Sequence, residues 1–398
     1  MTRALLFTGK GGVGKTTTAA ATAALAARRG VKTLVLSTDA AHSLADALAV
    51  PLGPDPTEIE DGFYGQQVDT QHSFERSWRE VRAYLGEVFE AAGVDPVEAE
   101  ELTVLPGADE VLALLAVHEQ LTAGRFDLVV VDCGPTAETL RLLALPEALS
   151  WYMRRIFPME RRVVRSLRPV LSRVAGMPMP HDRVFDAVER LHAHLTAVRD
   201  ALTDPNSAAV RLVTTPESVV IAETRRTLTG LSLYGYRVDA VLANRIMPMP
   251  PRATKGWQAG WAETHRERLA EIEESFAPLP LLQAPYAPAE PVGVAALSDF
   301  AEALYEQHDP TGLAPVTEPL TVERTTDGFA LSVALPFAAK EELELTRRGD
   351  DIAVTVGAAR RLITLPSALR RCDIEGARLD GGRLVVRFVP NPDLWMRS

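Results

Sequence analysis

A glycine-rich loop directly after an apolar run is the segment of this sequence best suited to chemistry. Positions 9–17 read Gly-Lys-Gly-Gly-Val-Gly-Lys-Thr-Thr and lead into an alanine-rich stretch. Because glycine accepts positive φ, backbone N–H groups of such a loop can point inward around an anion, and a following helix adds its N-terminal N–H groups and dipole. Lys15 would reach the β- and γ-phosphates of a nucleotide, and the Thr16 hydroxyl would ligate Mg²⁺. The residues expected to bind nucleotide here are Gly9, Lys10, Gly11, Gly12, Val13, Gly14, Lys15, Thr16 and Thr17.

Two aspartates follow apolar runs, at the kind of strand end where ligands of open parallel sheets gather. Asp39 comes after the run 33–37, where a carboxylate can orient and polarise the water that attacks a γ-phosphate. Phosphoryl transfer depends on placement and charge stabilisation, so we predict Asp39 and Lys15 as catalytic residues. Asp132 follows another such run and is expected to join Thr16 around Mg²⁺. An aspartate at a strand end can also cap the next helix, and this alternative stays open for Asp39.

These side chains need a scaffold that brings several strand ends together. The sequence up to residue 306 alternates strand-like and helix-like segments, and its strand-like runs are continuously apolar. That pattern predicts a doubly wound, mostly parallel α/β sheet over residues 1–307, with helices on both faces and helical insertions at about 70–122 and 144–205. The expected strands are 4–8, 33–37, 128–131, 209–213, 238–243 and 279–283, and the expected helices include 16–29, 108–122, 217–230 and 261–276.

The pattern changes after a short polar segment with proline and glycine, a linker predicted at 308–318. Beyond it, apolar and polar residues alternate with period two, for example along 330–335. Short alternating strands separated by turn residues predict a second, smaller domain, a β-sandwich over 319–390. No catalytic set of His, Asp or Ser residues is evident there, so we expect this domain to make protein contacts or to stabilise the chain.

Composition and charge exclude several classes of protein. Of the 398 residues, 46% are hydrophobic and 24% charged, which is typical of a soluble globular protein. No apolar run approaches the ~20 residues of a membrane-spanning helix, and the net charge of −11 argues against general nucleic-acid binding. The only cysteines, Cys133 and Cys372, cannot form a disulfide framework or a cysteine-rich zinc module, so we expect a reduced, cytoplasmic protein.

The glycine-rich loop and the two aspartate segments resemble those of the ArsA-type ATPases. This family of deviant-Walker P-loop NTPases includes anion-pump motor subunits and ATPases that target tail-anchored proteins. Residues 38–44 are similar to the family pattern Asp-Pro-Ala-His-Ser, with alanine in place of proline, and 132–141 are similar to its second switch segment, with changes at four positions. The resemblance covers about residues 1–306 and implies hydrolysis of ATP with Mg²⁺.

The resemblance also implies roles for three further residues. In the family, the lysine corresponding to Lys10 reaches across a nucleotide-sandwich homodimer, so Lys10 is a predicted catalytic residue and this chain, with one glycine-rich loop, a predicted homodimer. Asn244 corresponds to an asparagine that recognises adenine, and Glu217 to a glutamate near the nucleoside. Judged from the residues alone, Asn244 can also be a turn former and Glu217 a first-turn acid favoured by the helix dipole.

The insertion at 151–183 suggests what the nucleotide drives. It combines an apolar helical stripe with eight arginines and four methionines, and methionine suits surfaces that adapt to varied apolar partners. Targeting members of the family bury a client helix between such helices, so we predict that ATP hydrolysis is coupled to binding and release of a hydrophobic protein or membrane-protein client. A helix packed on its own domain, with a solvated arginine face, is the alternative.

Two other functions stay open. The resemblance alone allows the motor subunit of an anion (metalloid) efflux pump, although neither insertion contains cysteine, and 255–261 lacks the Cys-x-x-Cys zinc pair of targeting members. The C-terminal domain resembles the α-crystallin fold of small heat-shock proteins, with Leu-Pro at 335–336 and 365–366 and Gly-Gly at 381–382. A nucleotide-dependent scaffold that acts through this domain is therefore the third possibility.

Overall fold

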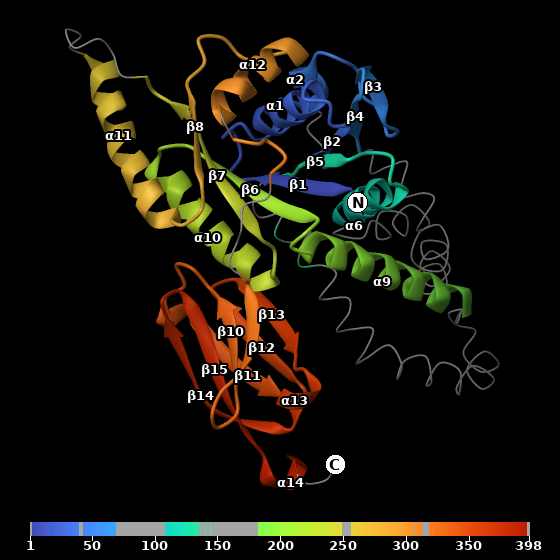
Figure 1. Cartoon of the computed structure of the whole chain (residues 1–398), viewed down its shortest axis with the longest axis vertical. Helices are drawn as coiled ribbons and strands as arrows, with labels where there is room; N and C mark the ends of the chain where they lie inside the picture. The colour runs from blue at the N-terminus through green and yellow to red at the C-terminus, as the bar shows by residue number, and fades with distance from the viewer. Residues whose placement is uncertain are drawn as a thin grey trace, which may run out of the picture.

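The computed structural model is drawn in Figure 1. It describes residues 2–39, 43–68, 108–134, 140, 144, 182–248, 256–306, 308–312 and 318–395. The predicted client segment 151–183 lies outside this part except for its last two residues, and so does most of the insertion 70–122. In the described part, no helix is long and apolar enough to cross a membrane.

An eight-stranded sheet forms the centre of the N-terminal domain, in the order β3-β4-β2-β5-β1-β6-β7-β8. All neighbouring pairs are parallel except the antiparallel hairpin of β3 and β4. Strands β2, β5 and β6 are buried along their whole length, which explains their unbroken apolar sequences. The strands span β1 (Arg3–Thr8), β2 (Thr33–Ser37), β3 (Thr57–Glu60), β4 (Phe63–Gln67), β5 (Leu128–Asp132), β6 (Ala208–Thr214), β7 (Val238–Ile246) and β8 (Leu281–Pro285).

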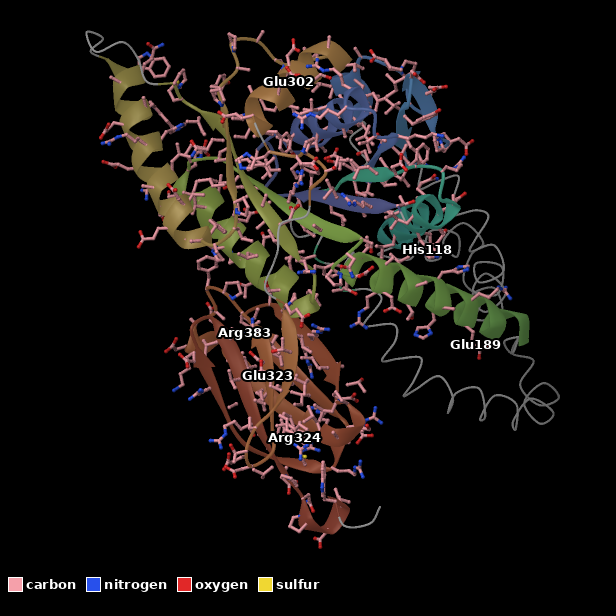
Figure 2. All side chains as sticks on the ribbon, in the orientation of Figure 1. His118, Glu189, Glu302, Glu323, Arg324 and Arg383 are labelled. Atoms are coloured by element: carbon pink, nitrogen blue, oxygen red, sulfur yellow. The ribbon has the colours of Figure 1, made fainter. Side chains whose placement is uncertain are left out.

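Helices cover both faces of this sheet, each over its own hydrophobic core (Figure 1). One face carries α1 (Lys15–Arg28), α2 (Ser43–Leu48) and α12 (Val294–Tyr305). The other carries α6 (Ala108–Ala123), α9 (Asp182–Thr203), α10 (Ser218–Tyr234) and α11 (Trp257–Phe276). At the surface, Glu302 of α12 forms an ion pair with Arg28 of α1 (Figure 2). The predicted doubly wound α/β architecture is confirmed.

The C-terminal domain is a β-sandwich of two antiparallel sheets, as predicted. A four-stranded sheet in the order β14-β15-β10-β9 packs on a three-stranded sheet, β11-β12-β13, and both contribute to one apolar core. Its elements are β9 (Leu320–Arg324), β10 (Phe329–Ala334), η1 (Lys340–Glu342), β11 (Leu343–Arg348), β12 (Asp351–Val356), β13 (Ala359–Thr364), α13 (Ser367–Arg370), β14 (Cys372–Asp380), β15 (Arg383–Pro390) and α14 (Pro392–Trp395).

The last turns of α10 join the two domains. Leu233 of this helix is fully buried within the core of the C-terminal domain, although its own helix belongs to the N-terminal one. The Leu233 carbonyl accepts a hydrogen bond of 2.6 Å from Arg361 of β13, and Thr229 donates to the Pro336 carbonyl. Phe337 adds an edge-to-face contact with Phe276 at the end of α11. The domains therefore share apolar and polar contacts besides the covalent connection.

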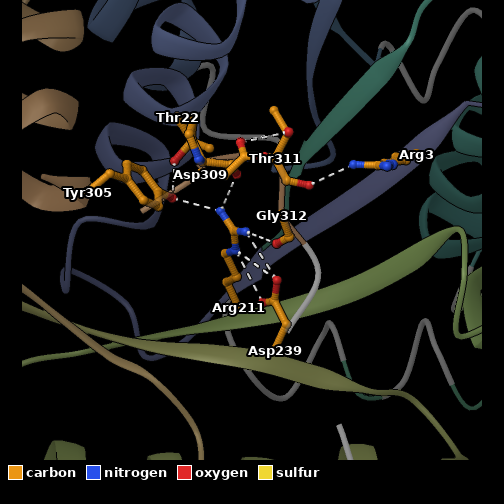
Figure 3. Close-up of polar contacts among 9 residues, drawn as sticks. Arg3, Thr22, Arg211, Asp239, Tyr305, Asp309, Thr311 and Gly312 are labelled. Carbon is orange, nitrogen blue, oxygen red and sulfur yellow. Dashed lines mark hydrogen bonds and ion pairs between the residues drawn. The ribbon is translucent and has the colours of Figure 1, made fainter. Parts of the chain in front are cut away.

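A buried arginine holds the segment that leaves α12 against the sheet (Figure 3). Arg211 of β6, only 3% exposed at its side chain, forms an ion pair of 3.1 Å with Asp239 of β7. The same guanidinium donates to the carbonyl oxygens of Pro310 and Gly312, and to the Tyr305 hydroxyl. Burial disfavours a charge on Arg211, but Tyr305 and Asp239 together raise its pKa, so it remains a cation. The first part of the predicted linker is thus fastened to the N-terminal domain.

Candidate nucleotide-binding site

The glycine-rich loop lies at the carboxyl edge of the sheet, between the end of β1 and the start of α1. Gly14 is the N-cap of α1 with φ 94°, a conformation that L side chains rarely adopt. A Cβ at Gly14 would also collide with the Asn244 side chain, and one at Gly9 with the Val213 carbonyl. Because these two positions require glycine, the loop can lie close to the neighbouring strands.

Lys15 is buried at the first position of α1, with 7% of the residue exposed. Its Nζ donates to the Lys10 carbonyl oxygen across the loop at 3.5 Å. A buried ammonium group costs free energy unless an anion or several acceptors compensate it. The position of Lys15 inside the loop therefore suits a phosphate group.

Thr16 and Asp132 meet below the loop, as the strand order requires, since β5 is the neighbour of β1. Asp132 is fully buried, and its Oδ2 accepts a hydrogen bond of 3.3 Å from Ser37. Burial raises the pKa of Asp132 to about 7, even though a hydrogen bond from Thr16 and the charge of Lys15 lower it. Its Oδ1 is buried and has no hydrogen-bond partner among the residues that the structure describes. A buried carboxylate oxygen without a hydrogen-bond donor, close to a threonine hydroxyl, is a suitable ligand for a divalent cation such as Mg²⁺.

Asp39 lies beside this pair, half-buried just after β2. Its backbone N–H donates to Ser37 Oγ at 3.2 Å, and its carbonyl accepts a hydrogen bond of 2.7 Å from Gln67. The Asp39 carboxylate contributes to raising the pKa of Asp132, which places two negative charges close together. Residues 40–42 of this segment lie outside the described part.

A pocket of about 240 Å³ opens next to the loop, lined by Gly14, Thr17, Asn244 and the turn at 285–291. Tyr286 of this turn is 56% exposed and offers an aromatic surface. The pocket shares Gly14 and Thr17 with the glycine-rich segment, and its walls are suited to a nucleoside.

Asn244 lies within β7, which continues to Ile246 instead of ending before it. Its Nδ2 donates to the Val13 carbonyl at 2.9 Å, and its Oδ1 accepts a hydrogen bond from Arg245 N at the same distance. Asn244 thus supports the glycine-rich loop as well as lining the pocket.

Glu217 is exposed at the N-cap of α10 and does not line that pocket. Its charge acts on His265 of α11, where burial lowers the histidine pKa and Glu217 raises it. The structure brings the other predicted residues together but places Glu217 toward α11.

Lys10 lies on the rim of the loop, with 37% of its side chain exposed. Its Nζ is 3.9 Å from Glu223 Oε2 on α10 of the same chain. The ammonium group therefore lies beside α10 and is partly exposed to solvent.

Ser37, Ser43 and Gln67 belong to this site and were not predicted. Ser43 Oγ lies 3.1 Å from Thr16 Oγ1, while Ser37 contacts both aspartates. Ser37 is the last residue of an apolar run, and this position at a strand end is a signal by which it could have been predicted. Gln67 is the last residue of β4, whose pairing with β2 is not evident from the sequence.

Cys133 follows Asp132 and is 3% exposed. Burial raises the pKa of its thiol well above the ordinary range, with Asp132 adding to the effect. Cys372 in the C-terminal domain is buried as well. Neither cysteine is placed to act as an exposed thiolate.

Two protein-family models match the chain. The model described as Anion-transporting ATPase matches residues 2–306, and the model described as HSP20-like domain found in ArsA matches residues 326–388.

Curated relatives match over most of their length. A Chlorobaculum tepidum protein named as an arsenical pump-driving ATPase is 38% identical over 370 residues, 92% of this chain and 91% of that protein. A Streptomyces coelicolor protein is 40% identical over 397 residues, the full length of both chains. The ATPase get3 of Schizosaccharomyces pombe is 26% identical over 302 residues, 75% of this chain and 90% of that protein.

Proposed function

Since the chain belongs to the anion-transporting ATPase family and is an ATP hydrolase, we propose that it works as a Mg²⁺-dependent homodimer whose ATP cycle binds and releases a hydrophobic protein or membrane-protein client. The observation that carries the proposal is the buried pair of Lys15 and Asp132 beside the half-buried Thr16 under the glycine-rich loop, where one Asp132 carboxylate oxygen lacks a hydrogen bond from the described residues. Such a group is costly in an apolar interior unless it serves a charged ligand.

Each residue has a defined task in this proposal. The loop amides and Lys15 bind the β- and γ-phosphates, and Asn244 keeps the loop in place while lining the nucleoside pocket. Thr16 and Asp132 would hold Mg²⁺, which when bound neutralises the charge that develops on the phosphates. Asp39 orients the attacking water; its backbone is held by Ser37 and Gln67, so its carboxylate keeps a defined position.

The homodimer follows from Lys10. A partly exposed lysine on the rim of the loop, whose ammonium group lies beside Glu223 of α10, can be reached by the site of a facing copy. The chain contains one glycine-rich loop, so a facing site must come from a second chain. Client binding is proposed from the sequence of 151–183 together with the family, and we propose a cytoplasmic location.

ATP turnover tests the nucleotide site. Lys15→Ala should abolish measurable hydrolysis of ATP, whereas Lys340→Ala, on an exposed lysine of the C-terminal domain, should leave it unchanged. Turnover that survives Lys15→Ala would contradict the assignment of the glycine-rich loop.

Capture of an apolar helix tests the client. Asp39→Asn protein loaded with ATP should retain a hydrophobic peptide, which the wild-type protein releases after hydrolysis. Failure of the ATP-loaded variant to bind any such helix would refute the client while leaving the ATPase intact.

A second candidate, the motor of an anion efflux pump, is favoured by the name of the Chlorobaculum relative. The buried positions of Cys133 and Cys372 weigh against metalloid binding through thiolates. Stimulation of ATP turnover by arsenite or antimonite would support the pump, and the same stimulation in a Cys133→Ser variant would show that this cysteine is not required.

A further inference from the structure

We propose that Arg245 stacks its guanidinium group on the base of the bound nucleotide, and that Asn244 supports the glycine-rich loop instead of reading the base. This assignment rests on the proposed nucleotide site, because Arg245 lines the pocket of about 240 Å³ beside the loop. Asn244 and Tyr286 line the same pocket. The contact with the base is thus assigned to an arginine that the motifs in the sequence do not indicate.

The side-chain amide of Asn244 is engaged within the chain. Its Nδ2 donates to the Val13 carbonyl at 2.9 Å, and its Oδ1 accepts a hydrogen bond of 2.9 Å from the Arg245 N–H. Only 6% of the residue is exposed. An asparagine that recognises adenine at two points uses both ends of its amide, the oxygen toward N6 and the nitrogen toward N7. Such a contact would compete with the hydrogen bond that holds the glycine-rich loop.

A β-bulge directs Arg245 to the pocket. The register of β7 against β8 shifts between Ala243 and Ile246, where residues 244 and 245 of β7 lie opposite a single residue of β8. An extra residue of this kind bends the strand and changes the direction of a side chain, and such bulges are common next to active sites. Strand β7 is buried from its start to Asn244, and Arg245 is its first exposed residue.

The backbone of Arg245 adopts a conformation that costs free energy. Its φ is 57°, in the left-handed region that residues other than glycine rarely adopt. The hydrogen bond from the Arg245 N–H to Asn244 Oδ1 stabilises this conformation. Glycine would adopt the same φ without strain, and strained residues gather at functional sites. The arginine at this position therefore indicates a use for its side chain.

The Arg245 guanidinium and the Tyr286 ring are suited to the two faces of a flat base. The guanidinium has no hydrogen bond or ion pair within the described part of the chain, and this planar group stacks readily on aromatic faces. Tyr286 lies close by, because its N–H donates at 2.8 Å to the carbonyl of Ile246, the residue after Arg245. Proteins hold purines between aromatic side chains and arginine planes in this way.

Nucleotide affinity tests the stacking role. Titration calorimetry would give the Kd for ADP and for GDP, which are not hydrolysed during the measurement, on the full-length wild type and on Arg245→Lys and Arg245→Gln. Both variants should bind both nucleotides about tenfold more weakly, because lysine keeps the charge but lacks the plane, and every purine offers a face. Arg324→Lys, at an exposed position of β9 (Figure 2), is the matched control and should bind like the wild type.

Thermal unfolding of the nucleotide-free protein supplies a second measurement. Arg245→Gly should raise the melting temperature, because it relieves the left-handed backbone, and should still bind ADP more weakly than the wild type. A lower melting temperature would show that the Arg245 side chain serves the fold, and would overturn the proposal.

The affinities separate the proposal from its alternatives. If Arg245→Lys retained the wild-type affinity while Arg245→Gln lost it, the charge would act on the phosphates and the stacking role would be wrong. A loss confined to ADP or to GDP would place the contact at the edge of the base, and unchanged affinity in every variant would remove Arg245 from the site. Each of these results would overturn the inference and leave the nucleotide site standing, whereas a wild-type protein that binds neither nucleotide would refute the site itself.

Discussion

Replacement of Lys10 by alanine should remove most ATP turnover while leaving the fold and the affinity for nucleotide nearly intact. The Lys10–Glu223 ion pair is 3.9 Å long and joins two partly exposed side chains, so its loss should cost at most about 1 kcal/mol of unfolding free energy. A cation supplied by a partner molecule to the transition state of phosphoryl transfer is worth about 10³-fold or more in turnover. We therefore expect a large loss of kcat and little change in the Kd for ATP.

Mixing inactive variants shows whether the lysine acts on its own chain or on its partner. In a heterodimer of Lys10→Ala and Asp39→Asn chains, the site on the first chain keeps Asp39 and receives Lys10 from the second. Random pairing in an equimolar mixture gives about half heterodimers, each with one complete site of two, so turnover should recover to about a quarter of the wild-type value. The assay is phosphate release after the two chains have been unfolded and refolded together.

A matched mixture serves as the control. Lys15→Ala and Asp39→Asn both affect residues that act within one chain, so their heterodimer contains no complete site and should stay inactive. If the Lys10→Ala and Asp39→Asn mixture also stays inactive although heterodimers form, Lys10 does not act across the interface and the reasoning is refuted. A protein that remains monomeric with ATP and Mg²⁺ would refute the homodimer itself.

Three other substitutions test features of the structure. Arg211→Met leaves Asp239 buried without its ion-pair partner and should lower the unfolding free energy, measured by chemical denaturation, by about 3–5 kcal/mol. The double variant with Asp239→Leu should recover much of this loss. An equal loss of stability in the single and double variants would contradict the pairing. Asp132→Asn should raise the Mg²⁺ concentration for half-maximal turnover at least about tenfold. Asp127→Asn, at an exposed position, should leave this concentration unchanged. If Asp132→Asn also left it unchanged, Asp132 would not belong to the cation site. Leu233→Ala should destabilise the C-terminal domain by about 2–5 kcal/mol although the residue belongs to α10. Hydrogen exchange would locate the effect, and Val219→Ala, at an exposed position of the same helix, is the control. If amide protection were lost only around α10, the two domains would not share a core.

Most of the fold could be predicted because the buried strands are continuously apolar and the glycine-rich loop marks the junction of β1 and α1. The hairpin of β3 and β4 was missed, since β3 reads Thr-Glu-Ile-Glu and is mostly exposed at the edge of the sheet. Arg211 also escaped notice: a charged residue inside an apolar run gives no local sign of its partners, which lie 28 residues away at Asp239 and 99 residues away at Pro310.

In the candidate site, too, some residues have a local signal in the sequence and others do not. Lys15, Thr16 and Asp132 follow from local sequence, because each stands at a strand end or a helix start whose place in a parallel sheet is general. Gln67 depends on which strand pairs with β2, and the second role of Asn244 depends on the approach of β7 to the loop. These are properties of tertiary packing, and one sequence does not contain a local signal for them.

The burial of Leu233 among residues of the β-sandwich limits how the chain can be divided. A fragment that ends before the sandwich would expose the Leu233 side chain to water at the end of α10. A sandwich produced alone would have a cavity in its core where Leu233 packs. Transfer of the sandwich to another ATPase would therefore require an aliphatic side chain at the position of that protein that corresponds to Leu233. A substitution on either side of this contact therefore alters an apolar core to which both domains contribute.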